Sequence, residues 1–193
     1  MLIPPVTLPP QLWVDMAGSG QTPQETADVA IFDDEHGLPG GGLWTSTYED
    51  GSSPYLRTVL GLNAGFLSTA PRPAWRLTPR EAKVYVAEDG NALLDLAALA
   101  PGAGTGVWSQ VEVFAEAVHM TAAGARAFLR TPVPEEPNFK ERIAVLIRLR
   151  RDGEINPFDL WEAERTIWFR WCFEGVERVA DVDVPLIEPA AVG

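Results

Sequence analysis

The sequence predicts a single α+β domain built on a mostly antiparallel β-sheet. Of its 193 residues, 46% are apolar, which is enough to bury one core. Strand-like and helix-like segments follow one another without the regular β–α–β alternation that produces a parallel sheet. A segment rich in Ile, Trp and Phe near the C-terminus, residues 162–171, predicts the most distinctive strand of this sheet.

The charge balance limits the classes of ligand. The formal net charge is −12 at pH 7, so the field of the molecule repels phosphate, and non-specific binding to DNA, RNA or an anionic membrane is not expected. The sequence has no run of ~18 consecutive apolar residues of the kind that crosses a bilayer. The acidic balance instead favours solubility, or a protein partner with a basic surface.

Cysteine usage and the N-terminal composition bear on localisation. The single cysteine, Cys172, cannot form an internal disulfide, and we expect a buried, inert thiol. Residues 1–10 contain four prolines and neither lysine nor arginine, unlike a signal peptide. A cytoplasmic location is therefore expected, and a particle assembled inside the cell, such as a phage virion, would show the same features.

The chain is expected to divide into a proline-rich arm, residues 1–10, and a single α+β domain, residues 11–193. The arm is predicted to be extended against the body or a partner, with disorder as the alternative. Leu12–Met16 predicts a first short strand. A capping-box pattern at residues 22–25 predicts a short helix that continues to about residue 30.

An acidic segment with one histidine, Asp33–His36, precedes a glycine-rich turn at residues 37–42. We expect a solvated loop rather than a metal site, because the chain has no His or Cys cluster to complete the ligand set. The glycines form either a structural turn or a loop that lets a ligand approach the backbone. A strand follows, with alternating faces made of Leu43, Thr45 and Thr47, and of Trp44, Ser46 and Tyr48.

The middle of the chain predicts three helix starts and three strands. The helix starts are Ser53-Pro54, Asp89 before a helix at residues 92–99, and Thr121 before a helix that ends near residue 129. The strands are residues 72–77, 82–87 and 117–120. Residues 107–113 fit either a short helix or a strand. His119 is expected to be a satisfied core or rim histidine rather than a ligand.

The last third predicts two further strands. Residues 143–149 form a continuous apolar run, which favours a buried strand, with a helix starting near Asn138 as the alternative. A rigid proline-rich loop at residues 132–137 precedes this run. The tail, residues 181–187, predicts an edge strand.

The strand at residues 162–171 is expected to have two different faces, because side chains two residues apart share a face. The mostly apolar face consists of Arg165, Ile167, Phe169, Trp171 and Phe173. The opposite face consists of Glu162, Glu164, Thr166, Trp168 and Arg170. Two carboxylates beside a hydroxyl and an indole make this second face the candidate for chemistry. The alternative is an edge strand whose charges face water and discourage pairing with another chain.

Four motifs resemble, in their order along the chain, a group of uncharacterised small proteins from actinobacteria and their phages. They are Gly41–Ser46, Lys83–Val86, Val118–Thr121 and Glu164–Arg170. That group looks like the ADP-ribosyltransferase fold, a split antiparallel β-sandwich with flanking helices that holds NAD in a central cleft. The resemblance covers about residues 36–173. It implies an NAD-dependent mono-ADP-ribosyltransferase acting on an unidentified acceptor.

The resemblance also implies site residues. Arginine-type transferases have an arginine on a first strand, a Ser-Thr-Ser-like motif on a second, and Glu-x-Glu on a late strand. Thr45, Ser46 and Thr47 match the second motif, and Glu162 and Glu164 match the third. NAD is the implied substrate, and no metal is implied.

The chemistry of the reaction suits these assignments. Cleavage of the nicotinamide glycosidic bond develops positive charge on the ribose, which a fixed carboxylate stabilises. Glu164 is the candidate for that role, and Glu162 for orienting or deprotonating the acceptor. Ser46 is expected on the nicotinamide side of the cleft, with Trp44 or Tyr48 stacking on a planar ring.

The chain departs from the family pattern on the first strand. Leu12–Met16 contains neither arginine nor histidine, so the contact to the diphosphate or ribose has no assigned residue. The candidates elsewhere are Arg57, Arg72 and Arg76.

A competing hypothesis is a non-catalytic interaction or structural protein, for example one associated with a virion, on a degenerate transferase-like fold. An enzyme is expected to have a cleft where Ser46 and Glu164 converge near an arginine or histidine. A structural protein is expected to have a filled cleft and a large surface that faces its partner.

Overall fold

The computed structural model describes residues 2–15, 18–24, 32–33, 39–57, 69–89, 92, 111–128 and 163–185. This part of the chain is rich in β-structure. The main strands are β1 (Pro5–Val6), β2 (Gln11–Val14), β5 (Leu43–Thr47), β7 (Ala74–Pro79), β8 (Ala82–Ala87), β9 (Ala117–Met120), β10 (Arg165–Trp168) and β11 (Phe173–Arg178). Two small pairs are β3 (Phe32–Asp33) with β4 (Pro39–Gly40), and β6 (Thr69–Arg72) with β12 (Val182–Pro185).

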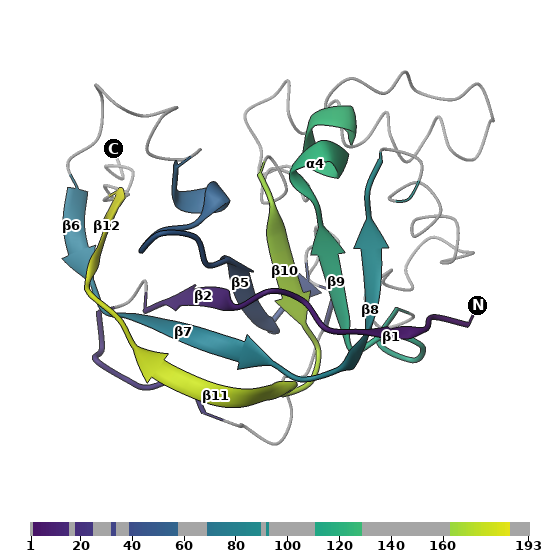
Figure 1. Cartoon of the computed structure of the whole chain (residues 1–193), viewed down its shortest axis with the longest axis horizontal. Helices are drawn as coiled ribbons and strands as arrows, with labels where there is room; N and C mark the ends of the chain where they lie inside the picture. Colours follow the sequence, from purple (N-terminus) through teal and green to yellow (C-terminus); the bar gives the residue numbers. More distant parts are fainter. Residues whose placement is uncertain are drawn as a thin grey trace, which may run out of the picture.

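The main strands form one curled, mixed sheet in the order β1-β8-β9-β10-β5-β2-β7-β11. All neighbours are antiparallel except β8 and β9, which run parallel. A β-rich sheet of this kind is compatible with the predicted α+β class. In Figure 1, β8, β9 and β10 stand upright on the right, whereas β2, β7 and β11 run across the lower left.

Strand β5 joins the two halves of the sheet because it changes partner along its length. Leu43, Trp44 and Thr45 pair with β10, while Ser46 and Thr47 pair with β2. The sheet therefore splits beside Ser46, where β10 and β2 diverge. Side chains rather than backbone groups must satisfy the polar atoms at this split.

Strand β10 lies in the middle of the sheet and is buried on both faces. It pairs with β9 on one side and with β5 on the other. Ile167 packs into a cluster with Val118 and Met120, and Trp168 packs into another with Leu77. The alternative of an edge strand with charges facing water is therefore wrong for residues 165–168.

The predicted strand at residues 162–171 is also too long. β10 ends at Trp168, Arg170 is exposed, and the next strand, β11, begins at Phe173. The bend allows Phe173 to pack edge-on against Trp168, with ring centroids 4.7 Å apart. Burial of these rings holds β11 against the core formed by β10. Cys172 is fully buried, as predicted, and burial raises the pKa of its thiol to about 11.

The proline-rich segment lies extended across the body (Figure 1). Pro5 and Val6 pair with Lys83 and Ala82 of β8, and Leu8 is buried in the core. These contacts bring Pro9 and Gln11 to the split in the sheet, where both take part in the polar network described below.

The three helix starts predicted in the middle of the chain have the expected caps. The Ser53 hydroxyl accepts the Leu56 amide at 3.2 Å before a helical turn at residues 54–57, and the Asp89 carboxylate accepts the Ala92 amide at 2.9 Å. The Thr121 hydroxyl accepts the Gly124 amide at 3.0 Å and begins α4 (Ala122–Phe128). Each cap satisfies an amide that the first turn leaves unpaired.

Other predicted elements have mixed outcomes. The strands at residues 82–87 and 117–120 are confirmed, while residues 72–77 belong to two strands separated by Pro73. The tail strand is confirmed at Val182–Pro185, where it pairs with β6. Residues 22–24, where the capping-box pattern predicts a helix start, have no helical structure. The rest of that predicted helix, the loop at 34–38, the helix at 93–99 and the segments at 132–137 and 143–149 lie outside the described residues.

Candidate functional site

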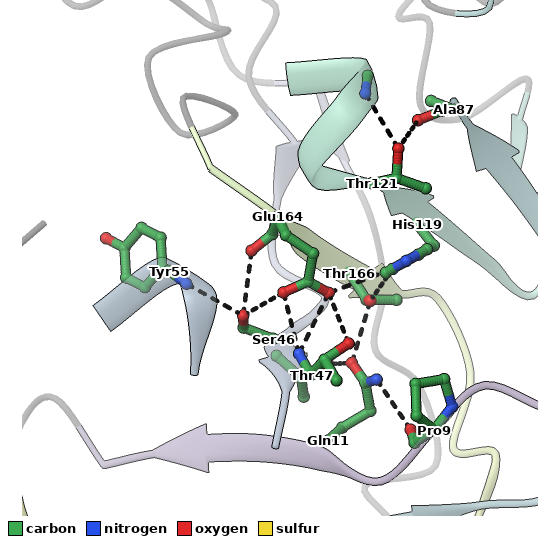
Figure 2. A network of polar contacts seen from close by, with 12 residues as sticks. Pro9, Gln11, Ser46, Thr47, Tyr55, Ala87, His119, Thr121, Glu164 and Thr166 are labelled. Atoms are coloured by element: carbon green, nitrogen blue, oxygen red, sulfur yellow. Dashed lines mark hydrogen bonds and ion pairs between the residues drawn. The ribbon is translucent and has the colours of Figure 1, made fainter. Parts of the chain in front are cut away.

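The Glu164 carboxylate fills the split beside β5. Continuing the β10–β5 register beyond Thr166 and Thr45 places Glu164 opposite Thr47. The Thr47 amide lies 3.1 and 3.0 Å from Oε1 and Oε2, and the Thr47 hydroxyl donates to Oε1 at 2.9 Å. The Ser46 hydroxyl donates to Oε2 (Figure 2). The carboxylate thus accepts the hydrogen bond from the Thr47 amide that a backbone carbonyl of the neighbouring strand would accept in a regular β-sheet.

Two opposing effects act on the protonation of Glu164. Burial raises the pKa of its carboxyl, because desolvation disfavours the charged form. Hydrogen bonds from Ser46 and Thr47 act in the opposite direction, while the negative charge of Glu49 adds to the rise. The Thr47 amide can only donate to the carboxylate, whereas the Ser46 hydroxyl has one hydrogen for two acceptors, Oε2 and the Glu164 backbone carbonyl at 3.1 Å.

A second polar layer lies beneath this carboxylate and is centred on Gln11, which is fully buried. Its side-chain nitrogen donates to the Pro9 carbonyl at 3.0 Å, which fixes the orientation of the amide. Oε1 therefore accepts the hydroxyls of Thr45 at 2.8 Å and Thr166 at 3.1 Å. The Trp168 indole donates to the Thr45 hydroxyl at 2.9 Å, which completes the layer.

His119 links the two layers (Figure 2). Its Nδ1 lies 2.8 Å from the Thr166 hydroxyl and 3.5 Å from Oε1 of Glu164. Because the single hydroxyl proton of Thr166 goes to Gln11, Nδ1 of His119 carries the proton that it shares with Thr166. Burial lowers the pKa of His119 to about 4, so the ring is neutral at pH 7 and its contact with Glu164 is not an ion pair.

A pocket of about 340 Å³ lies next to this network. It is lined by the end of β2 and the residue after it, the middle of β5 and a glycine before it, the helical turn after Ser53, and the first residue of β10. The lining residues are Leu12, Trp13, Val14, Asp15, Gly42, Trp44, Thr45, Ser46, Ser53, Tyr55, Leu56 and Arg165. Ser46 belongs both to this lining and to the shell of Glu164, so it connects the pocket to the carboxylate.

Arg165 is the positively charged residue among the described residues that line the pocket, and it contacts two aromatic rings. Its guanidinium carbon lies 3.6 Å from the ring centroid of Tyr55 and 5.1 Å from that of Trp44. Burial lowers the pKa of Arg165, against the opposing influence of Tyr55 and Glu164. Arginine remains charged in proteins because its ordinary pKa is above 12.

The predicted site residues do not all meet at the pocket. Trp44, Thr45 and Ser46 line it, and Glu164 lies behind Ser46. Tyr48 is not among the residues that line this pocket. It packs against an apolar cluster whose members Leu12 and Leu56 do line the pocket, and the guanidinium carbon of Arg76 lies 5.8 Å from its ring centroid. Glu162 lies outside the described residues.

None of the three arginines proposed from the sequence lines this pocket. Arg57 is half exposed and pairs with Glu49, and Arg76 lies 3.6 Å from Glu177. Arg72 packs beside Gly18.

Sequence reasoning missed three members of the site. Alternation assigns Arg165 to the mostly apolar face of its strand. A charged residue among apolar ones was the signal that could have indicated a site there. Gln11 and His119 gave no local signal, because their partners lie 34 to 155 residues away along the chain. The expectation that His119 is a satisfied core histidine is confirmed. The sequence did not predict its contact with Glu164.

Comparison with protein-family models, curated proteins and solved structures yields no match. Within the described ranges, no three His, Cys, Asp or Glu side chains are grouped to hold a metal ion. In the same part of the chain, no helix has the length and apolar character that a membrane span requires.

Proposed function

We propose that the pocket binds NAD and that the chain is a mono-ADP-ribosyltransferase, which transfers ADP-ribose to an unidentified acceptor. One observation carries this proposal. The first strand, the Thr45-Ser46-Thr47 strand and the start of the late strand, which the family resemblance assigns to an NAD cleft, contribute to one pocket. Ser46 links that pocket to the carboxylate expected to act on the ribose.

The pocket suits part of a nucleotide. A volume of about 340 Å³ lies in the range of small-molecule sites, and aromatic and aliphatic side chains dominate the lining. Trp44 offers an aromatic surface for a planar ring. Ser46, Thr45 and Asp15 also line the pocket and carry polar groups that can orient hydroxyl groups of a ligand.

Glu164 would stabilise positive charge on the ribose during cleavage of the nicotinamide bond. A buried carboxylate that is held in place costs no reorganisation when charge develops, and the low local dielectric strengthens its effect. In the structure the Ser46 hydroxyl lies on Oε2. A ribose in the pocket therefore reaches the carboxylate when this hydroxyl turns from Oε2 toward the ligand.

A second candidate is a non-catalytic ligand-binding or interaction protein, and one observation favours it. Glu164 is only 5% exposed, and its carboxylate already accepts hydrogen bonds from both Ser46 and Thr47. Such a carboxylate can hold the split sheet together without any chemistry. In this case the pocket binds its ligand and the bond to nicotinamide stays intact.

Calorimetric titration with NAD, combined with assay of nicotinamide release, tests these candidates. The variants are Glu164→Gln and, as a matched control, Glu174→Gln on the exposed side of β11. The transferase proposal expects Glu164→Gln to bind NAD but to release nicotinamide on the order of 10²-fold more slowly, because one fixed electrostatic contact to the transition state is lost. Glu174→Gln should equal the wild type.

Each other result has a definite meaning. Binding of NAD without release by the wild type supports the non-catalytic candidate. A wild type that neither binds NAD nor releases nicotinamide contradicts the NAD proposal. Release that persists unchanged in Glu164→Gln shows that the activity does not use this carboxylate.

A further inference from the structure

We propose that Arg165 binds a phosphate group of the ligand in this pocket, and so supplies from β10 the cation that the first strand lacks. The inference rests on the proposed function in taking that ligand to be NAD. It assigns the phosphate contact and the reactive carboxylate to consecutive residues, Arg165 and Glu164, at the start of one strand.

The ring contacts prepare Arg165 for this role. With Tyr55 at 3.6 Å and Trp44 at 5.1 Å from the guanidinium carbon, aromatic rings cover faces of the planar group. Ring contacts involve the faces of a guanidinium, whereas phosphate oxygens bind a guanidinium along its edge in a bidentate manner. The rings also limit the rotamers of a long side chain, which reduces the entropy lost on binding.

Hydrogen bonds connect the turn that carries Tyr55 to the residues that bind the Glu164 carboxylate. Tyr55 belongs to the helical turn that Ser53 caps, and its backbone amide donates to the Ser46 hydroxyl at 3.4 Å. The same hydroxyl binds the Glu164 carboxylate. Ser46 therefore links the backbone of the turn that carries Tyr55 to the carboxylate proposed to act on the ribose (Figure 2).

The charge distribution supports an anion at Arg165. The chain carries a formal charge of −12, so a phosphate ligand needs a local cation to offset the repulsion. Arg165 is the one cationic residue among the described residues that line the pocket. The acidic residue of the lining, Asp15, is engaged by the Ser19 hydroxyl at 3.0 Å and the Gly20 amide at 2.7 Å. This leaves the Arg165 end of the pocket as the favourable place for phosphate.

A ligand series tests the phosphate contact directly. Nicotinamide riboside, nicotinamide mononucleotide and NAD contain zero, one and two phosphates, and calorimetry measures the affinity gained at each step. ADP serves as a probe without nicotinamide. The proteins are wild type, Arg165→Gln, Arg165→Lys and the control Arg57→Gln. Arg57 belongs to the helical turn that carries Tyr55, but it does not line the pocket.

For the wild type we expect the first phosphate to tighten binding roughly tenfold or more, as a charge-assisted contact requires. In Arg165→Gln this gain should fall below about threefold. Arg165→Lys should retain part of it, because the charge remains but the stacked fork is lost. Arg57→Gln should keep the full gain. If Arg165→Gln does not fold by circular dichroism, the reduced gain in Arg165→Lys carries the test.

The outcomes separate this inference from the proposed function. Nicotinamide release with an undiminished phosphate gain in both Arg165 variants overturns the assignment of Arg165 and leaves the function intact. Binding of ADP that depends on Arg165, without nicotinamide release, supports the phosphate site and contradicts the transferase. A wild type that gains no affinity from phosphate overturns the inference.

Discussion

The Glu164 carboxylate accepts the backbone amide of Thr47 at 3.0 and 3.1 Å, so a side chain continues the β-ladder at the point where the sheet splits. This contact joins β10 to β5 after their backbone pairing has ended at Thr166 and Thr45. It also places a buried carboxyl group beside the pocket. The same group can therefore hold the fold together and take part in chemistry, and the following predictions separate these roles.

Gln11 should be essential for stability. Gln11→Ala leaves the hydroxyls of Thr45 and Thr166 and the carbonyl of Pro9 without their buried partner, and it opens a cavity. We expect a loss of about 2–4 kcal/mol in the free energy of unfolding, measured by urea denaturation. Gln21→Ala, at an exposed position, is the control and should change stability by less than about 0.5 kcal/mol. Equal stability of the two variants would contradict the proposed importance of the Gln11 layer.

Gly42→Ala should test the close approach of β5 to β10. An added Cβ would lie 2.8 Å from Cγ1 of Ile167, and the backbone has a φ of +74°. Gly51→Ala has a similar φ of +79° but no atom within 4 Å, so it measures the backbone strain alone. We expect Gly42→Ala to destabilise the protein by about 1–3 kcal/mol more than Gly51→Ala in thermal or urea unfolding. A smaller loss for Gly42→Ala than for Gly51→Ala would show that Ile167 moves freely at this site.

His119 should make stability depend on pH once Glu164 is neutralised. The pKa of His119 is about 4 in the fold and 6.5 in a free side chain, because burial disfavours the charged ring. Between these values the unfolded chain binds more protons, so stability rises with pH. The raised pKa of Glu164 acts in the opposite direction above pH 4.5. In Glu164→Gln we therefore expect stability to increase by up to roughly 3 kcal/mol from pH 4 to 6.5.

The control for that measurement is the double variant Glu164→Gln with His119→Gln, which lacks both titrating groups. Urea unfolding at several pH values should show a smaller rise in stability for the double variant than for Glu164→Gln alone. Identical pH profiles would show that His119 is protonated as easily in the fold as in the unfolded chain.

Ser46→Ala should shift the pH dependence of the proposed reaction. The Ser46 hydroxyl helps to hold down the pKa of Glu164, so its removal should raise that pKa further. Because the ionised carboxylate is the active form, the acidic limb of the profile for nicotinamide release should move to higher pH. Ser52→Ala, outside the shell of Glu164, should leave the limb in place. An unshifted limb in Ser46→Ala would mean that Glu164 does not control this part of the profile.

Several site features were accessible from the sequence because they depend on neighbours along the chain. Alternation correctly assigned Glu164, Thr166 and Trp168 to one face of the strand and Ile167 to the other. Local alternation does not say whether a strand is central or at an edge, which depends on pairing with distant segments. The edge-strand alternative for β10 failed for this reason.

The sequence by itself determined the positions of strands β5, β8 and β9 and the caps at Ser53, Asp89 and Thr121, because periodicity and capping act within a few residues. Only the tertiary structure decided that β5 changes partner at Ser46 and that the split is filled by Glu164, Gln11 and His119. It also placed Arg165 in contact with two aromatic rings at a pocket. The physical reason is that these contacts join segments far apart in the chain, and burial of polar groups is favourable only when distant partners satisfy them.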